Sequence, residues 1–492
     1  MPIHSRITSI NSFATGKTER VPIVSEYIED YFHVKTNRPL DNTVANNIET
    51  KGIDWTKAAD DGTGEAEGLM WLKKLYETDD HSLWPKVNTD MVVDGRNVGN
   101  GSAYLLSNGN QKLQNGTANM SGTSGAGIKF EKDAFTIERS DLISNVYTTN
   151  STMDPMVYFS FKKKKKFFDI KVYEGNQTAG RVINHDLDCV PGSVWIKSLS
   201  TVENWMVYHK YGTGADTNIA YKYYYDLANT NAANFIGAGL IEPVGTTHVT
   251  LNVDFNQINK SGEKYVIIFF ADTGSGGFGD DGSLDGIACG SGTVGDWNST
   301  DAYQDLGFEP QWVLVKGYSS SESTQPWCIV DSQRNMYSEY QDTGSTNPAR
   351  SPTLNANSNA QQANTMSLFT DGGGFYIRKN QNILSDGDKY IYIAIAKPQR
   401  TAIQQNMFLN GVGTGATNFF SPTTVTAGVS KPTVRPGFSP DSAWIKINYN
   451  EGAADWNVFN RKVGFKEVAG MSNARQYRLR FNSSGNKDGG SD

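Results

Sequence analysis

The chain has 492 residues, of which 45 are Lys or Arg and 52 are Asp or Glu, for a net charge of −7. This length is too great for one hydrophobic core and fits about three to five domains, while the balanced charge gives no reason to expect nucleic acid, which favours a clustered basic face. The three cysteines form no CxxC pair, and neither a secretion signal nor a run of about eighteen apolar residues occurs, so a disulfide framework, a zinc site and a membrane span are not predicted.

The first 51 residues are polar and mixed. Val21–Ile28 and Tyr31–Val34 fit either strands or a short helix. We expect an N-terminal arm over residues 1–51 with possible lead-in strands, and we place attachment to another protein there because chain termini lie at domain surfaces.

Residues 52–166 form a first unit of short strand candidates joined by loops rich in Asn, Gly, Ser and Thr. The unit ends in five consecutive lysines, Lys162–Lys166. Such a run could bind a phosphate, a lipopolysaccharide or a nucleic-acid strand. It could also be a solvated strand end that keeps a sheet edge from pairing with other sheets, and the lack of interleaved aromatic residues favours this second interpretation.

Residues 167–272 form the clearest unit, with seven strand candidates and no amphipathic helical period, which predicts a β-sandwich. Phe168–Tyr173 alternates as a strand, and Arg181–His185 is expected to return as its hairpin partner after the turn at Gly175–Gly180. A tyrosine cluster further on could contact sugars or protein surfaces, although alternate residues of a strand usually pack in the core; its members are Tyr221, Tyr223 and Tyr225.

Residues 273–286 are a linker rich in Gly and Asp, in which Asp280, Asp281 and Asp285 are weak candidates for a calcium site. The stretch lacks the distal glutamate of an EF-hand, so a flexible linker explains it with fewer assumptions. A third unit follows over 287–398 and a shorter fourth over 399–492. The fourth has no counterpart of the last two strands, which suggests an edge open to a second subunit.

One phrase recurs about every 120 residues: an apolar run that ends in Lys, a polar gap and an aromatic-rich run, which predicts two half-buried strands joined by a loop. We interpret its tryptophans and lysines as structural residues that close sheets rather than react. The residues that define the repeat are Trp71, Lys73, Trp195, Lys197, Trp205, Leu314, Lys316, Trp327, Trp444, Lys446 and Trp456. The expected fold is therefore all-β, with about four consecutive sandwich-like or jelly-roll-like units, the last incomplete.

No motif of an enzyme stands out. The six histidines are scattered, and neither HExxH nor GxSxG occurs, so we expect no catalytic residues, cofactor or bound metal. Acidic pairs such as Asp60–Asp61 could serve a glycosidase, which needs two carboxylates across a sugar, but the sequence does not show their separation.

Several stretches together resemble the repeat-built tail and tail-fibre virion proteins of marine tailed phages. The matching segments are Phe168–Asn176, Val194–Lys197, Trp205–His209, Gly307–Lys316, Leu354–Asn357 and Tyr390–Ala396. This resemblance implies a non-enzymatic, tail-associated virion protein that assembles in the host cytoplasm with other virion proteins, as a homo-oligomer, and that contacts a host glycan or receptor. A capsid decoration or vertex protein, and a tailspike that binds or cleaves glycans, are the alternatives.

Overall fold

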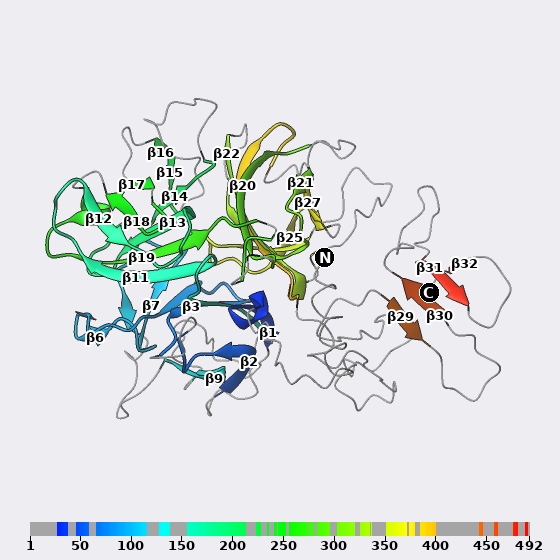
Figure 1. Ribbon diagram of the computed structural model, residues 1–492, viewed down its shortest axis with the longest axis horizontal. Coiled ribbons are helices and arrows are strands. Elements are labelled where there is room, and N and C mark those ends of the chain that lie inside the picture. Colours follow the sequence, from blue (N-terminus) through cyan, green and yellow to red (C-terminus); the bar gives the residue numbers. More distant parts are fainter. Residues whose placement is uncertain are drawn as a thin grey trace, which may run out of the picture. The chain divides into compact units, whose positions relative to one another are not determined.

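The protein is represented by a computed structural model (Figure 1). The residues that it describes are 27–37, 46–58, 65–115, 127–137, 155–212, 223–227, 234–235, 241–243, 245–251, 255–274, 276–279, 282, 284–295, 303–319, 325–334, 336, 351–370, 373–378, 384–399, 442–445, 457–460, 476–480 and 488–490. Almost all of their regular structure is antiparallel strand, which confirms the predicted all-β fold. The chain divides into two compact units, residues 1–338 with 347–399 and residues 339–346 with 400–492.

The first compact unit contains three six-stranded sheets with the same strand order, one in each of three successive modules. In the first module the order is β1 (Phe32–Asn37), β10 (Met156–Lys162), β3 (Gly68–Lys74), β4 (Ser82–Lys86), β7 (Ala103–Leu106) and β8 (Gln114–Asn115). In the second it is β11 (Phe168–Glu174), β19 (Lys264–Ala271), β13 (Pro191–Ser198), β14 (Met206–His209), β15 (Tyr223–Tyr225) and β16 (Asn234–Phe235). In the third it is β20 (Ile287–Thr293), β28 (Lys389–Ala396), β22 (Pro310–Ser319), β23 (Trp327–Asp331), β24 (Ser351–Asn355) and β25 (Ala363–Met366).

A small sheet covers one face of each large sheet, so each module is a sandwich. The small sheets are β2 (Asn46–Asp54) with β9 (Ile128–Ile137), β12 (Arg181–Asn184) with β18 (His248–Leu251) and β17 (Ile241–Pro243), and β21 (Tyr303–Asp305) with β27 (Gly374–Ile377) and β26 (Leu368–Thr370). Ring contacts join the two layers at matching places, Phe135 to Tyr158, His185 to Phe269 and Phe375 to Tyr392. The described helices are short: η1 (Ile28–Asp30), α2 (Asn256–Asn259) and η4 (Ser332–Arg334).

The central strands are buried on both faces, so the expectation of half-buried strands was wrong. Every residue of β3, β10 and β13 is buried. Side chains alternate between the two faces of a strand, and both sets are covered, one by the small sheet and the other by the neighbouring modules. A strand covered on both faces is apolar nearly throughout, and this agrees with the sequence of Lys264–Ala271.

The predicted hairpin between Phe168–Tyr173 and Arg181–His185 is also wrong. In the structure β11 pairs with β19, whereas β12 pairs with β18 in the small sheet. The connection crosses from one layer to the other, and its backbone bonds to the loop before β19, with Gly175 N–H donating to the Glu263 carbonyl. An alternating segment followed by a glycine turn fits a layer crossing as well as a hairpin.

The inner faces of the three large sheets share one aromatic core. Trp71 of β3 lies 6.2 Å from Trp195 of β13 between ring centroids, and Trp195 lies 6.5 Å from Trp327 of β23. Trp312 of β22 completes the set, 5.9 Å from Phe159 of β10. Each module therefore packs against the other two, and the three modules form one folded body.

The second compact unit contains a four-stranded sheet in the order β29 (Ser442–Ile445), β30 (Asn457–Asn460), β31 (Gln476–Arg480) and β32 (Asp488–Gly490). Trp444 pairs with Val458 in this sheet, as Trp195 pairs with Val207 in the second module. The four strands follow the order of β13 to β16, so this part of the repeat pattern continues here. Among the described residues of both compact units, no helix is long and apolar enough to span a membrane.

Candidate functional site

The lysines of the repeated phrase occupy equivalent buried positions. Lys73, Lys197 and Lys316 are at most 1% exposed. The ammonium of Lys73 donates to the Glu77 carbonyl at 2.9 Å, and that of Lys197 donates to the Glu203 carbonyl at 2.7 Å. Lys316 donates in the same way to the Gln325 carbonyl. Each lysine thus holds the loop that joins its strand to the next one.

Burial governs the electrostatics of these lysines. Removal from water disfavours a charged ammonium, and this burial lowers the pKa of Lys73 and Lys197 to about 8 and that of Lys316 to about 7. A lysine with such a pKa can act as a nucleophile where a substrate reaches it. Here the ammonium groups are buried under backbone carbonyls, so their geometry supports a structural role.

A second set of equivalent residues joins each module to the preceding one. Trp205, directly before β14, donates its indole N–H to the Leu106 carbonyl of the first module at 2.9 Å. Trp327, at the start of β23, donates to the Asp226 carbonyl of the second module at 3.0 Å. Leu106 ends β7 and Asp226 follows β15, and these two strands hold the same place in their sheets. The same contact is therefore made twice, one module apart.

His81 takes this position in the first module, directly before β4. Its Nδ1 accepts the indole N–H of Trp71 at 3.0 Å, which leaves the proton of the neutral ring on Nε2. Burial lowers the pKa of His81, and the backbone of Asn355 at the end of β24 opposes this shift. The third module is thus the neighbour of the first at this position, and Ser107 adds a hydrogen bond of 2.5 Å to the Ala356 carbonyl.

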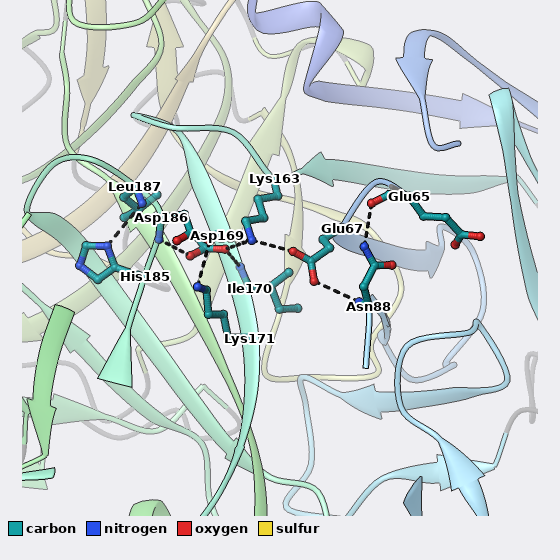
Figure 2. A network of polar contacts seen from close by, with 10 residues as sticks. All are labelled: Glu65, Glu67, Asn88, Lys163, Asp169, Ile170, Lys171, His185, Asp186 and Leu187. Carbon is teal, nitrogen blue, oxygen red and sulfur yellow. Dashed lines mark hydrogen bonds and ion pairs between the residues drawn. The ribbon is translucent and has the colours of Figure 1, made fainter. Parts of the chain in front are cut away.

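Five residues form an ion-pair network at the junction between the first and second modules (Figure 2). Lys163, directly after β10, lies 2.6 Å from the Glu67 carboxylate of the first module. It also lies 3.3 Å from Asp169 and 2.9 Å from Asp186, which belong to the second module. Lys171 adds a second cation 2.9 Å from Asp186. Figure 2 shows Lys163 between Glu67 on one side and the two aspartates on the other.

The charges of this network stabilise one another. Burial alone would lower the pKa of Lys163, yet the carboxylates of Asp169, Glu67 and Asp186 raise it above the ordinary value. Burial acts to raise the pKa of Asp186, but its hydrogen bonds with Lys163 and Lys171 bring it down to about 2. Burial raises the pKa of Asp169, while Lys163 and the Asp186 N–H oppose this shift. The Lys163 ammonium therefore stays charged among these carboxylates. The network links the two modules through ion pairs and does not act as an acid–base pair.

Both interpretations of the Lys162–Lys166 run need correction. Lys162 and Lys164 are buried, and both ammonium groups lie over the Tyr31 ring, at 5.8 and 5.5 Å from its centroid. Lys163 belongs to the ion-pair network, and of the five only Lys165 is exposed. Most of the run is therefore covered at the junction between modules, so it is neither a solvated strand end nor an open basic patch.

The calcium and tyrosine candidates gain little from the structure. The Asp285 carboxylate accepts the Gly276 N–H at 3.2 Å within the linker, and Asp280 and Asp281 lie outside the described residues. In the described part of the chain, no three His, Cys, Asp or Glu residues gather as a metal site would require. Tyr223 and Tyr225 belong to β15, whereas Tyr221, Lys446 and Trp456 are outside the described residues.

The repeat residues of the first compact unit occupy equivalent positions in their modules. Trp71, Trp195 and Leu314 pair with Phe159, Ile268 and Ile393, each on the strand that closes its module. Sequence reasoning missed the contributions of His81, Trp312 and Lys163. An aspartate within an apolar strand, as Asp169 in β11, was the available signal for the junction, because a carboxylate in a buried strand needs a cation.

These contacts define a protein that is built from three equivalent β-modules around a shared core. The chain belongs to the family described as "Domain of unknown function (DUF7483)", which it matches over residues 45–398. This range includes most of the three modules. No curated protein and no solved structure matches the chain.

Proposed function

We propose that the chain is a non-enzymatic structural protein of a phage virion and that it is associated with the tail. Its resemblance to repeat-built tail and tail-fibre proteins motivates the assignment. The structural observation that carries it is the closed arrangement of the three modules, in which equivalent side chains join each module to the others. A body fixed in this way transmits force and holds surface loops in place, and both are tasks of a tail component.

The contacts that occupy the chemically reactive side chains also favour this function. Lys73, Lys197 and Lys316 are buried under carbonyls, and Lys163 holds three carboxylates. Residues that combine perturbed pKa values with a reachable position mark active sites, whereas these residues fasten strands and modules. Their chemistry serves the stability of the body.

The proposed partners are other virion proteins, further copies of this chain and a host surface glycan or receptor. Strand β29 supports the second of these, because its described partner is β30 alone. In the three modules the equivalent strand has a second neighbour that closes the sheet, as β19 does beside β13. A strand supplied by another copy would complete the C-terminal sheet in the same manner.

Electron microscopy of phage particles labelled with antibody against residues 27–399 tests the assignment. We expect label along the tail or its fibres. Label confined to capsid faces or vertices would favour a capsid decoration protein, and particles free of the chain would overturn the virion assignment. Release of reducing sugar from host polysaccharide by the purified chain, lost on changing one carboxylate pair, would instead establish a glycan-cleaving tailspike.

A further inference from the structure

The contacts between modules repeat in one direction around the body. Leu113, directly before β8, donates its N–H to the Leu199 carbonyl directly after β13 at 3.0 Å. Gln362, directly before β25, donates in the same way to the Leu75 carbonyl directly after β3 at 2.7 Å. The first contact leads from the first module to the second, and the other leads from the third module to the first. With the indole contacts described above, they link the first module to the second, the second to the third and the third to the first.

Head-to-tail contacts that close after three steps relate the modules by an approximate threefold rotation axis. The chain itself returns to its starting point, because the Gln399 N–H donates to the Glu29 carboxylate at 2.9 Å. This hydrogen bond brings the end of the third module beside the beginning of the first. Since a rotation keeps equivalent points at one height along its axis, equivalent residues of the three modules lie on one level.

The connections that follow the lysine-ended strands form one such set, at the sheet ends opposite the links between modules. They are residues 75–81, 199–205 and 320–326, which we call the loop surface. In the first module Met156 pairs with Lys74 beside this surface, whereas Lys162, which leads into the second module, pairs with Gly68 at the other end. The second module has the same register.

Two of these connections carry an exposed apolar side chain at the same point. Five large hydrophobic residues are exposed in the part of the chain that the structure describes, and Tyr76 at 51% and Val202 at 60% are two of them. Each directly precedes the residue whose carbonyl accepts the buried lysine of its module, Glu77 and Glu203 respectively. In the third module Thr324 takes this position, outside the described residues.

The buried lysines prepare these two side chains for binding. Each ammonium fixes the backbone one residue after the exposed side chain, so little conformational freedom remains for a binding partner to remove. Each exposed side chain is followed by a half-buried glutamate, which gives the apolar surface an acidic edge. A protein pocket with apolar walls and a basic rim is complementary to such a pair.

We propose that the loop surface binds a threefold-symmetric protein of the virion, with the axis of the body on the axis of the partner. This inference rests on the proposed virion function. Tyr76 and Val202 each enter an apolar pocket with a basic rim, on two subunits of the partner. Two weak contacts made at once by one rigid body bind more tightly than either alone. A partner with the same rotation axis offers two identical pockets in the matching places.

Electron cryomicroscopy of phage particles, reconstructed without imposed symmetry, tests this inference. We expect residues 27–399 to lie on a threefold or sixfold axis of the neighbouring protein, with Tyr76 and Val202 at the contact. Particles that lack the chain would overturn the virion function and this inference with it. A chain that is present but lies off such an axis, or that binds through the opposite ends of its sheets, would overturn this inference alone.

Substitutions of the two exposed residues test the contact itself. Tyr76→Ser combined with Val202→Ser should lower the number of copies per particle by about tenfold, because both contacts lose their apolar side chain. Val182→Ser is the matched control, since Val182 is 52% exposed on β12 of a small sheet, and it should leave the copy number unchanged. Equal Tm values of the purified chains verify that both variants fold.

Two results of these substitutions would overturn the proposal. One is a double variant that enters particles in the same number of copies as the wild type. The other is self-association of the purified full chain that the double substitution abolishes, because this result would assign the loop surface to a second copy of the chain.

Discussion

At the scale of single residues, Lys197 shows how the fold accommodates a buried charge, whose removal from water costs free energy. Its ammonium is buried, yet it donates to three carbonyls, those of Asn110, Ser198 and Glu203. Unsatisfied carbonyls in a buried loop would each cost about 1–3 kcal/mol. The lysine therefore compensates for its own desolvation by satisfying the loop, and one of these carbonyls belongs to the first module.

The depressed pKa of Lys197 predicts a specific pH dependence. The folded chain releases this proton near pH 8, while the unfolded chain keeps it up to about 10.5, so the unfolded state binds more protons between these values and stability rises with pH. The free energy of unfolding, wild type minus Lys197→Met, should therefore increase from about pH 7.5 to 9.5 in urea titrations. Lys165→Met is the exposed control, and parallel pH curves for wild type and Lys197→Met would contradict the prediction.

His209 predicts the same direction of change, stability that rises with pH, in the acid range. Burial lowers its pKa from 6.5 to about 4, and the ring bonds to the Tyr392 carbonyl at 3.0 Å. The unfolded chain takes up a proton in this window and the folded chain does not, so stability is fully present above about pH 6.5 and is lost as the pH falls toward 4. His209→Gln keeps a donor for the carbonyl but cannot titrate. Its stability deficit relative to wild type, measured by urea unfolding, should shrink on acidification, and a deficit that stays constant between pH 7 and pH 4 would contradict the prediction.

At the scale of elements, the decisive feature is how strands are linked between modules. β10 of the first module leads through the five-lysine segment into β11 of the second, and Lys163 sits between them. The Asp169 side chain is 1% exposed, so its carboxylate has little water to replace a lost cation. Removing one partner of a buried pair costs more than the pair contributes.

Lys163→Met should therefore destabilise the body by about 3–5 kcal/mol, measured from urea unfolding. Lys165→Met, two positions away in the same run and exposed, should change stability by less than about 0.5 kcal/mol. Equal effects of the two substitutions would show that the junction does not depend on the ion pairs. Partial recovery of Lys163→Met at low pH, as the carboxylates are protonated, would support them further.

At the scale of the whole molecule, the repeated strands could be predicted from the sequence, whereas the packing of the three modules around one core could not. The phrase around Trp195 and Lys197 predicts equivalent strands because the same residues recur at matching places. Half-burial was inferred from alternation, but Trp195 faces other modules rather than water, and no local pattern reports a partner more than one hundred residues away. The lysine run misled because the carboxylates that surround Lys163 come from three separate places in the fold, before β3, in β11 and after β12.

The central claim is that residues 27–399 form one body in which no module is stable alone. Removing a module would expose tryptophans such as Trp195 and Trp312, each of which buries about 150–250 Å². The modules should then open together, with one free energy and one dependence on denaturant.

Native-state hydrogen exchange of the amides in β3, β13 and β22 tests this claim most directly. We predict that the slowest amides of all three strands exchange with a common free energy and a common slope against denaturant. A module whose amides exchange at a distinctly lower free energy, while the other two stay protected, would contradict it.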